Sequence, residues 1–367
     1  MAPPSPRLVV PIDLKKKPWE QKYPLHNRWH PRIPAVAEVT EGELFRVEMM
    51  DWSGGSIADN DSAMDIKSMD LAIGHCLSGP IRVVDKEGVP AKPGDLLAIE
   101  ICNLGPLPGD EWGYTATYDR ENGGGFLTDH FPSATKAIWY FEGIYTYSPH
   151  IPGVRFPGLN HPGLIGTAPS IELLNIWNER ERKLVENGPN SLKICEINEG
   201  TSEWEKVANE AARTIPGREN GGNCDIKNLS TGSKLYLPVF VEGANLSAGD
   251  MHFSQGDGEI SLCGAIEMSG YLELKVEAGR QRARAAERKI EEGNGGLEVA
   301  SGPYRLRSEQ ASTSHEACEN FGGWRWHSDE ACSCVWKSRA QKLGSDVYNR
   351  WSEDGREEAR SVPGEEG

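Results

Sequence analysis

The stretch GSKLYLPVFVEGANLSAGDMHFSQGDGEISLCGAIEMSGYLELKV, Gly232 to Val276, alternates short apolar runs with glycine-rich turns. Runs of this length, rich in Val, Ile, Leu and Tyr and bounded by Gly, Asn and Asp, are typical of β-strands. The last part of the stretch predicts two strands joined at Met268 to Gly270. Pro238 has no backbone N–H, so its strand is expected to be an edge strand or a bulged strand.

The same pattern recurs before this stretch and predicts a mainly β fold with few helices. The chain contains 41 Gly and 24 Pro, which is high for a helical protein. Segment 42–52 alternates around Leu44, Val47 and Met49, and segment 79–113 reads as strand, turn, strand. Segment 169–188 is the clear exception, because its apolar spacing predicts a helix that Ser170 caps and Gly188 ends.

Charge and cysteine content limit the partners and the compartment. The 367 residues include 39 Lys and Arg against 55 Asp and Glu, a formal net charge of -16. Generic binding to nucleic acid or to anionic membranes is therefore not expected. The first residues do not resemble a signal peptide, and no stretch is apolar for long enough to span a bilayer. Eight scattered cysteines favour a reducing setting, so we expect a cytoplasmic protein.

The composition of the chain changes after residue 276. The segment that follows is first strongly charged and then polar and poorly periodic, with scattered tryptophans. Such sequence has little apolar surface to bury. We expect residues 1–276 to form a β-rich catalytic region and residues 277–367 to form a divergent, poorly ordered tail.

Six stretches resemble, in the same order, the acetamidase/formamidase family, and in particular its plant- and fungal-type formamidases. They are HNRWHPRIPAV from His26, DWSGG from Asp51, GPLPGDEWGYT from Gly105, FPGLNHPGLIGTAPS from Phe156, NGGNCDIKNLSTGSKLYLPVFVEGANLS from Asn220 and GDMHFSQGDGEISLCGAIEMSG from Gly249. The resemblance covers about residues 11–276 and not the tail. It implies a β-sandwich-like core, hydrolysis of formamide or a similar short amide, a homo-oligomer and a divalent metal ion, with zinc preferred.

Two glycine-flanked loops offer residues for such a metal site. Hydrolysis of an amide requires an activated water, and a bound metal ion lowers the pKa of its water. Asn223 and Asp225 lie two residues apart, as do Asp250 and His252, so each pair points to one side of an extended segment. We predict that Asp225 and His252 are metal ligands, and we also count His252 among the catalytic residues.

The remaining roles fall mostly on the same loops. Glu259 is the preferred general acid/base, with Asp257 as its competitor. His161, Gln255 and Asn223 are the candidate substrate-binding residues. A simpler interpretation is that the aspartates of the 250–258 loop only stabilise a turn. Glu267 lies in an apolar run and either faces solvent or supports the site.

Other functions stay open at this level. The acidic loop around residues 51–65 could attract a cation, although a solvated loop is the default. Cys224 or Cys263 could act as the nucleophile of a thiol amidase, although buried inert thiols are commoner. The unmatched tail and the lack of a self-sufficient catalytic motif also allow an inactive relative or a β-sandwich binding module.

Overall fold

The computed structural model describes residues 5–124, 126–186, 207, 209–256, 262–279 and 298–300. The described helices are α1 (Met64–Ser68), α2 (Ile171–Glu186) and three short 3-10 helices, η1 (Pro18–Glu20), η2 (Leu71–Ile73) and η3 (Phe126–Asp129). The strands are β1 (Arg7–Val10), β2 (Arg28–Trp29), β3 (Ala37–Thr40), β4 (Phe45–Met49), β5 (Leu77–Val84), β6 (Leu96–Pro106), β7 (Trp112–Thr117), β8 (Thr135–Glu142), β9 (Tyr145–Tyr147), β10 (Arg155–Pro157), β11 (His161–Gly166), β12 (Ala212–Arg213), β13 (Gly217–Arg218), β14 (Gly221–Asn223), β15 (Lys234–Pro238), β16 (Leu246–His252), β17 (Leu262–Met268), β18 (Gly270–Gly279) and β19 (Glu298–Ala300). None of the described helices is long and apolar enough to cross a membrane.

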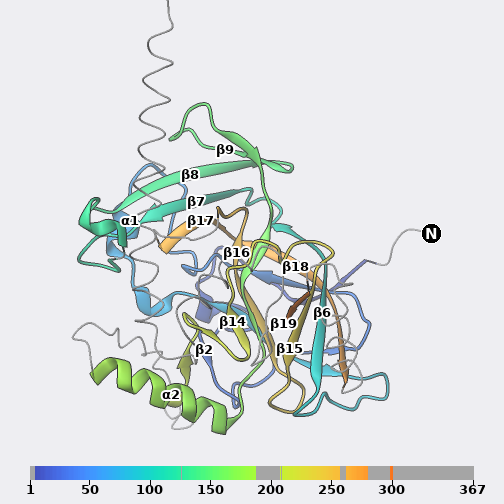
Figure 1. Cartoon of the computed structure of the whole chain (residues 1–367). Helices are drawn as coiled ribbons and strands as arrows, with labels where there is room; N and C mark the ends of the chain where they lie inside the picture. Colours follow the sequence, from blue (N-terminus) through green and yellow to red (C-terminus); the bar gives the residue numbers. More distant parts are fainter. Residues whose placement is uncertain are drawn as a thin grey trace, which may run out of the picture. The chain divides into compact units, whose positions relative to one another are not determined.

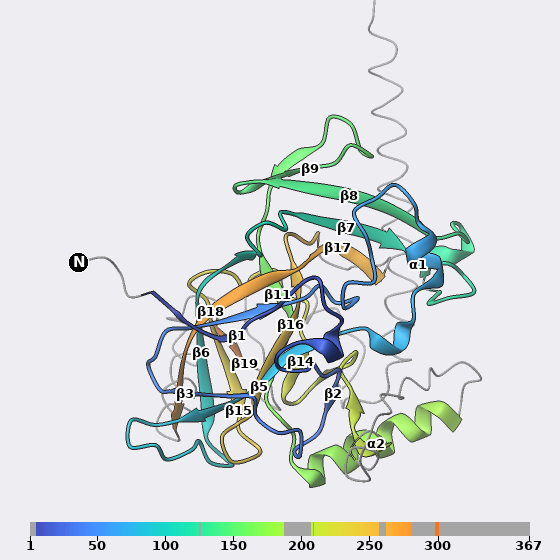
Figure 2. The ribbon, with the colours of Figure 1, turned by 180° about the vertical axis from the view of Figure 1, so that it is seen from behind.

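The strands form two main sheets (Figures 1 and 2). The smaller sheet has the order β1-β4-β18-β6-β15-β19. The larger has the order β10-β9-β8-β7-β17-β16-β11-β14-β13, and β5 and β3 join it through β16. Strands β2 and β12 pair separately. The prediction of a mainly β fold with few helices is confirmed.

Both sheets contribute to one apolar core. Phe45, Leu235 and Leu272 come from the smaller sheet, and Ile165 and Met251 come from the larger, and all belong to the same buried cluster. In β4 the buried residues are Phe45, Val47 and Met49, which is the period-two alternation of a strand with one face on a core. The core therefore lies between two facing layers, as the predicted β-sandwich-like fold requires.

The two strands predicted at the end of the opening stretch are present and belong to different sheets. Strand β17 ends at Met268 in the larger sheet, and β18 begins at Gly270 in the smaller one. Ser269 alone connects them, so the chain crosses between the layers within one residue. Pro238 is the last residue of β15, and β19 pairs only with Lys234–Tyr236, so among the described strands Pro238 has a neighbour on one side only.

Helix α2 begins and packs as its sequence predicts. The Ser170 hydroxyl oxygen accepts a hydrogen bond from the Leu173 backbone N–H at 3.1 Å, which satisfies one of the free donors at the start of the helix. Leu174 and Trp177 are buried, and the Trp177 indole donates to Glu219 at 2.7 Å. The helix therefore covers the β2–β12 pair, at the bottom of Figure 1.

Candidate functional site

Strand β16 lies in the interior of the larger sheet and carries the centre of the candidate site. It pairs with β11, β17 and β5. Its last residue, His252, stands opposite His161 of β11 and Glu267 of β17, and Glu267 in turn stands opposite Tyr114 of β7. Directly opposite residues project from the same face of a sheet. The register therefore aligns four side chains, all at most 2% exposed, in a row across four neighbouring strands.

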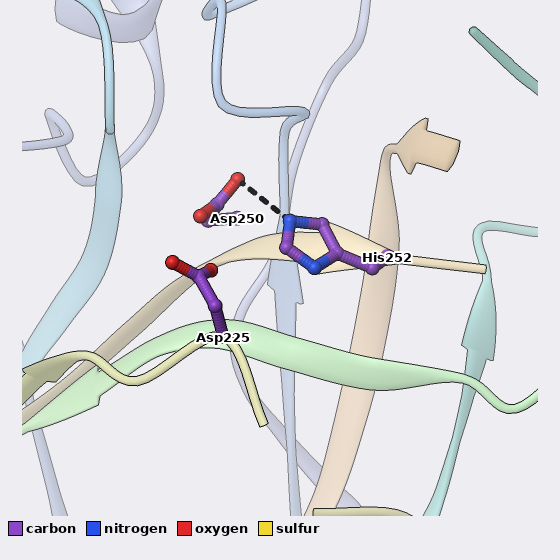
Figure 3. Close-up of side chains that lie close together, drawn as sticks. All are labelled: Asp225, Asp250 and His252. Carbon is purple, nitrogen blue, oxygen red and sulfur yellow. Dashed lines mark ion pairs between the residues drawn. The ribbon is translucent and has the colours of Figure 1, made fainter. Parts of the chain in front are cut away.

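Three side chains near this row could hold a cation (Figure 3). The ligand atoms of Asp225, Asp250 and His252 all lie within 4.8 Å of one another. His252 Nε2 is 3.4 Å from Oδ1 of Asp250 and 3.3 Å from Oε2 of Glu267. Asp225 follows β14, in another part of the chain. The two residues predicted as metal ligands, Asp225 and His252, are therefore brought together.

The two aspartates do not reach this position by simple strand alternation. Asp225 has a φ of 47° and Asp250 a φ of 58°, in the left-handed region that non-glycine residues rarely adopt. Such backbone costs of order 1–3 kcal/mol per residue and is often found at functional sites. The alternation expected from the sequence is therefore replaced by local backbone turns that direct the two carboxylates.

Gly163 of β11 makes the close approach possible. Its carbonyl oxygen accepts hydrogen bonds from the backbone N–H groups of Cys224, at 2.8 Å, and Asp225, at 3.2 Å. A Cβ at position 163 would collide with the carboxylate of Asp250 and would lie 2.9 Å from Oδ1 of Asp225 and 2.8 Å from Cε1 of His252. Because glycine has no side chain, both carboxylates can gather over β11.

The electrostatics of the cluster favour a positive charge at its centre. Burial lowers the pKa of His252, but the charges of Glu267 and Asp250 outweigh burial and raise that pKa well above its usual range. Burial raises the pKa of Asp250, but its interactions with His252 outweigh it and lower the pKa below its usual value. The site therefore stabilises a cation between buried carboxylates.

The donor set suits a divalent metal ion. Carboxylate oxygens and an imidazole nitrogen are zinc ligands in proteins and also bind other divalent ions. The three ligand atoms lie within 4.8 Å of one another, and a Cβ at Gly163 would intrude on all three side chains. These residues fit the divalent metal ion that the sequence resemblance implies.

The other residues predicted for the site differ in where the structure places them. Asn223 ends β14, two residues before Asp225, and its buried Oδ1 has no hydrogen-bond partner among the described residues. Gln255 is half-buried in the segment after β16. Asp257 and Glu259 lie outside the described residues. His161 is fully buried, and its Nε2 lies 3.1 Å from Nδ1 of His252.

Sequence reasoning missed the position of two residues. Glu267, which the sequence left either facing solvent or supporting the site, is 2% exposed and contacts His252. His75 received no role, yet it lies two residues before Leu77, which pairs with Gly249, and the charges of Asp250 and His252 act on it. Its φ of 57° is also left-handed. The polar residue within an apolar strand was a usable signal for Glu267, whereas no spacing pointed to His75.

A buried lysine of β8 pairs with the acidic loop. The Lys136 ammonium group of β8 donates to the Asp65 carboxylate at 2.6 Å and to the Ala58 carbonyl oxygen at 2.9 Å, and its side chain is only 1% exposed. Tyr140 and His150 contact Asp59 and Asp61 of the same loop. These contacts bind the loop to the β8–β9 region.

The two cysteines considered as nucleophiles lie in unfavourable surroundings. Burial, together with the negative charge of Asp225, raises the pKa of Cys224 to about 12, which opposes formation of a thiolate. Cys263 is 1% exposed, and its Sγ lies 3.5 Å from the Tyr118 hydroxyl. The geometry does not favour a thiol nucleophile.

Comparison with known proteins gives consistent matches. The profile of the Acetamidase/Formamidase family matches residues 11–292. The chain is 52% identical over 280 residues to a formamidase of Methylophilus methylotrophus, covering 74% of this chain and 68% of that protein. It is 50% identical over 289 residues to an acetamidase of Mycolicibacterium smegmatis, covering 74% and 70%.

A solved structure agrees with these sequence matches. The γ-lactamase of Delftia acidovorans superposes with a TM-score of 0.71 at 44% identity, covering 76% of this chain and 69% of the lactamase. The family match spans the segments that carry Asp225, Asp250 and His252. The chain therefore belongs to the acetamidase/formamidase family and is a hydrolase of amide carbon–nitrogen bonds.

Proposed function

We propose that this protein hydrolyses formamide, or a similar short linear amide, to the carboxylate and ammonia at a divalent metal site formed by Asp225, Asp250 and His252. The observation that carries the proposal is the convergence of these three ligand groups within 4.8 Å, in a chain whose relatives include a formamidase and an acetamidase. The alternative of an inactive relative or binding module has no support from the comparisons.

The chain's own residues have distinct tasks in this reaction. Asp225, Asp250 and His252 hold the ion, for which zinc is our preferred identity. When bound, the ion polarises the amide carbonyl and makes its water more acidic. Asp250, His252 and Glu267 are buried, which limits bulk water beside them and strengthens the charge interactions among them. We assign substrate contacts to Asn223 and Gln255, and the unpartnered Oδ1 of Asn223 suits an amide N–H.

Proton transfer to the leaving nitrogen requires a further group. Glu259, with Asp257 as its competitor, keeps this proposed role, although both lie outside the described residues. Glu267 is the buried carboxylate that the structure places beside His252. The substitutions Glu259→Gln and Glu267→Gln separate these roles: loss of the proton carrier lowers kcat at unchanged metal content, whereas loss of a charge beside His252 also lowers the metal content.

The decisive experiment measures ammonia release from formamide together with metal content. Removal of the metal by a chelator should lower activity by about 100-fold or more, and added Zn²⁺ should restore it. His252→Ala should lose the bound metal, whereas His130→Ala, an exposed histidine, should retain it. Full activity in metal-free protein would overturn the proposal.

The preferred amide is expected to depend on a small difference in fit. One methyl group distinguishes acetamide from formamide and contributes roughly 1–3 kcal/mol in a fitted pocket. The ratio of kcat/KM for the two amides measures this difference. A ratio near one would show that the pocket does not discriminate between them.

We also propose that the active protein is a homo-oligomer. Seven exposed large apolar side chains lie in segment 131–159, which contains β8, β9, β10 and the turns around them: Phe131, Ile144, Tyr145, Tyr147, Ile151, Val154 and Leu159. Exposed apolar surface of this density often marks an interface. Light scattering of the purified chain gives its mass directly, and Ile144→Asp should lower that mass.

We also propose a cytoplasmic location and a domain boundary after residue 276. Cys76, Cys102, Cys224 and Cys263 are free thiols, which agrees with a reducing cytoplasm. We assign catalysis to residues 1–276 and a divergent tail to residues 277–367, noting that β18 continues to Gly279 and that β19 pairs with β15. Fractionation of cells tests the first assignment, and activity after replacement of the tail tests the second.

A further inference from the structure

The imidazole rings of His161 and His252 contact each other at the candidate site. They stand opposite each other on β11 and β16, nearly perpendicular, with their centroids 4.9 Å apart. Nε2 of His161 lies 3.1 Å from Nδ1 of His252. Both side chains are at most 1% exposed, so solvent does not compete for this contact.

A backbone group determines where the proton of His161 lies. Nδ1 of His161 lies 2.8 Å from the carbonyl oxygen of Leu159. A carbonyl oxygen only accepts hydrogen bonds, so Nδ1 of His161 must carry a hydrogen. A neutral imidazole has one ring hydrogen, and Nε2 of His161 is then an acceptor.

The same argument determines which nitrogen of His252 carries a hydrogen. Because Nε2 of His161 accepts, Nδ1 of His252 must donate, and it therefore carries a hydrogen. Nε2 of His252 is then the nitrogen left for other partners. It faces Oδ1 of Asp250 (Figure 3) and Oε2 of Glu267. Outer partners commonly fix ligand histidines in this way.

We infer that His161 is a positioning residue: hydrogen-bonded to the Leu159 carbonyl oxygen, it holds the Nδ1 hydrogen of His252 and directs Nε2 of His252 at the cation site. The chain of contacts runs from a main-chain carbonyl through two buried rings to the carboxylates. His161 therefore orients His252, whereas the sequence analysis expected it to contact the substrate. The inference rests on the proposed function only for the identity of the cation.

Three substitutions at one position separate the two contacts of the ring. In His161→Gln the side-chain amide oxygen can reach the place of Nε2 and accept from His252. In His161→Asn the shorter amide replaces the Nδ1 contact to Leu159 and does not reach His252. His161→Leu has neither contact, so the three variants form a matched set of similar size.

The first measurement is Zn²⁺ affinity, determined by competition with a coloured chelator and without substrate. We expect His161→Leu and His161→Asn to bind Zn²⁺ about 10- to 100-fold more weakly than the wild type. His161→Gln should retain most of the affinity. Equal affinity in all four proteins would overturn the inference, and so would variants that only raise KM, because substrate contact would then be the role of His161.

The second measurement reads the ring hydrogens directly in the wild-type protein and does not depend on any variant folding. Nitrogen-15 NMR of histidine-labelled protein should show His161 with hydrogen on Nδ1 and none on Nε2, and His252 with hydrogen on Nδ1. A hydrogen on Nε2 of His161 would overturn the inference. If the wild type binds no divalent ion, the proposed metal function fails, while the spectrum of the metal-free protein still tests the relay.

Discussion

Glu267 and His252 stand directly opposite each other on β17 and β16, and Oε2 of Glu267 lies 3.3 Å from Nε2 of His252. Glu267 is therefore a buried carboxylate beside His252, although its neighbours in the sequence of β17 are apolar. The register between β17 and β7 shifts between Cys263 and Glu267, and such irregularities often re-aim side chains beside active sites.

The first prediction concerns this carboxylate. Glu267→Gln keeps the size of the side chain and removes its charge, so the cation site loses one of its negative neighbours. We expect kcat/KM for formamide to fall by about 10- to 100-fold, together with weaker metal binding. Steady-state ammonia release checks this, with Glu100→Gln on the other sheet as a control that should behave as the wild type. Wild-type activity in Glu267→Gln would remove Glu267 from the site.

The second prediction concerns the space beside the ligands. Gly163→Ala should displace Asp225, Asp250 or His252, because the added Cβ would meet all three. A misplacement of about 1 Å can lower activity about 100-fold, so we expect a loss of that order together with weaker metal binding. Gly105→Ala in β6 is the matched control, since its Cβ would lie 3.5 Å from the Tyr271 ring in ordinary contact. Equal losses in the two variants would contradict the crowding argument.

The third prediction concerns stability in acid. Burial lowers the pKa of His26 from 6.5 to about 4, despite its hydrogen bond to the Arg28 carbonyl oxygen. The unfolded chain therefore takes up this proton first as the pH falls. The contribution of His26 to stability is present above pH 6.5 and is lost progressively as the pH falls toward 4, by about 2 kcal/mol between pH 7.5 and pH 5.

Urea unfolding at several pH values measures this effect. His26→Gln removes the titrating group, so its free energy of unfolding should depend less steeply on pH than that of the wild type. The difference between the two slopes isolates His26 from the other titrating groups. Parallel slopes would show that His26 is not responsible for the loss.

The fourth prediction concerns the ammonium group inside the acidic loop. Lys136→Met leaves the carboxylate of Asp65 without its buried partner, so we expect a loss of about 3 kcal/mol in the free energy of unfolding. Amide hydrogen exchange in residues 57–65 should become faster. Lys67→Met removes a half-exposed ion pair with Asp119 and should cost less than about 1 kcal/mol. Unchanged exchange in the loop would show that Lys136 does not hold it.

Several elements could be predicted because their signals are local. Of the residues expected to alternate in β4, Val47 and Met49 are buried, while Phe45 and not Leu44 is the third buried position; the cap at Ser170 marks the start of α2 as predicted. The sequence drew attention to Asp225 and His252 because both lie in glycine-flanked loops, whereas the left-handed backbone that directs Asp225 and Asp250 was not visible in it. Such patterns depend on neighbours within a few positions, so the sequence displays them directly.

The site could not be predicted from the sequence because its contacts join residues that are far apart along the chain. His161 and His252 are 91 positions apart, and Lys136 and Asp65 are 71 apart. Their meeting depends on strand register, which burial of each strand's apolar face fixes over the whole sheet. By itself the sequence determined the strands, the helix and the family resemblance, whereas register and the missing Cβ of Gly163 decided which side chains form one cluster.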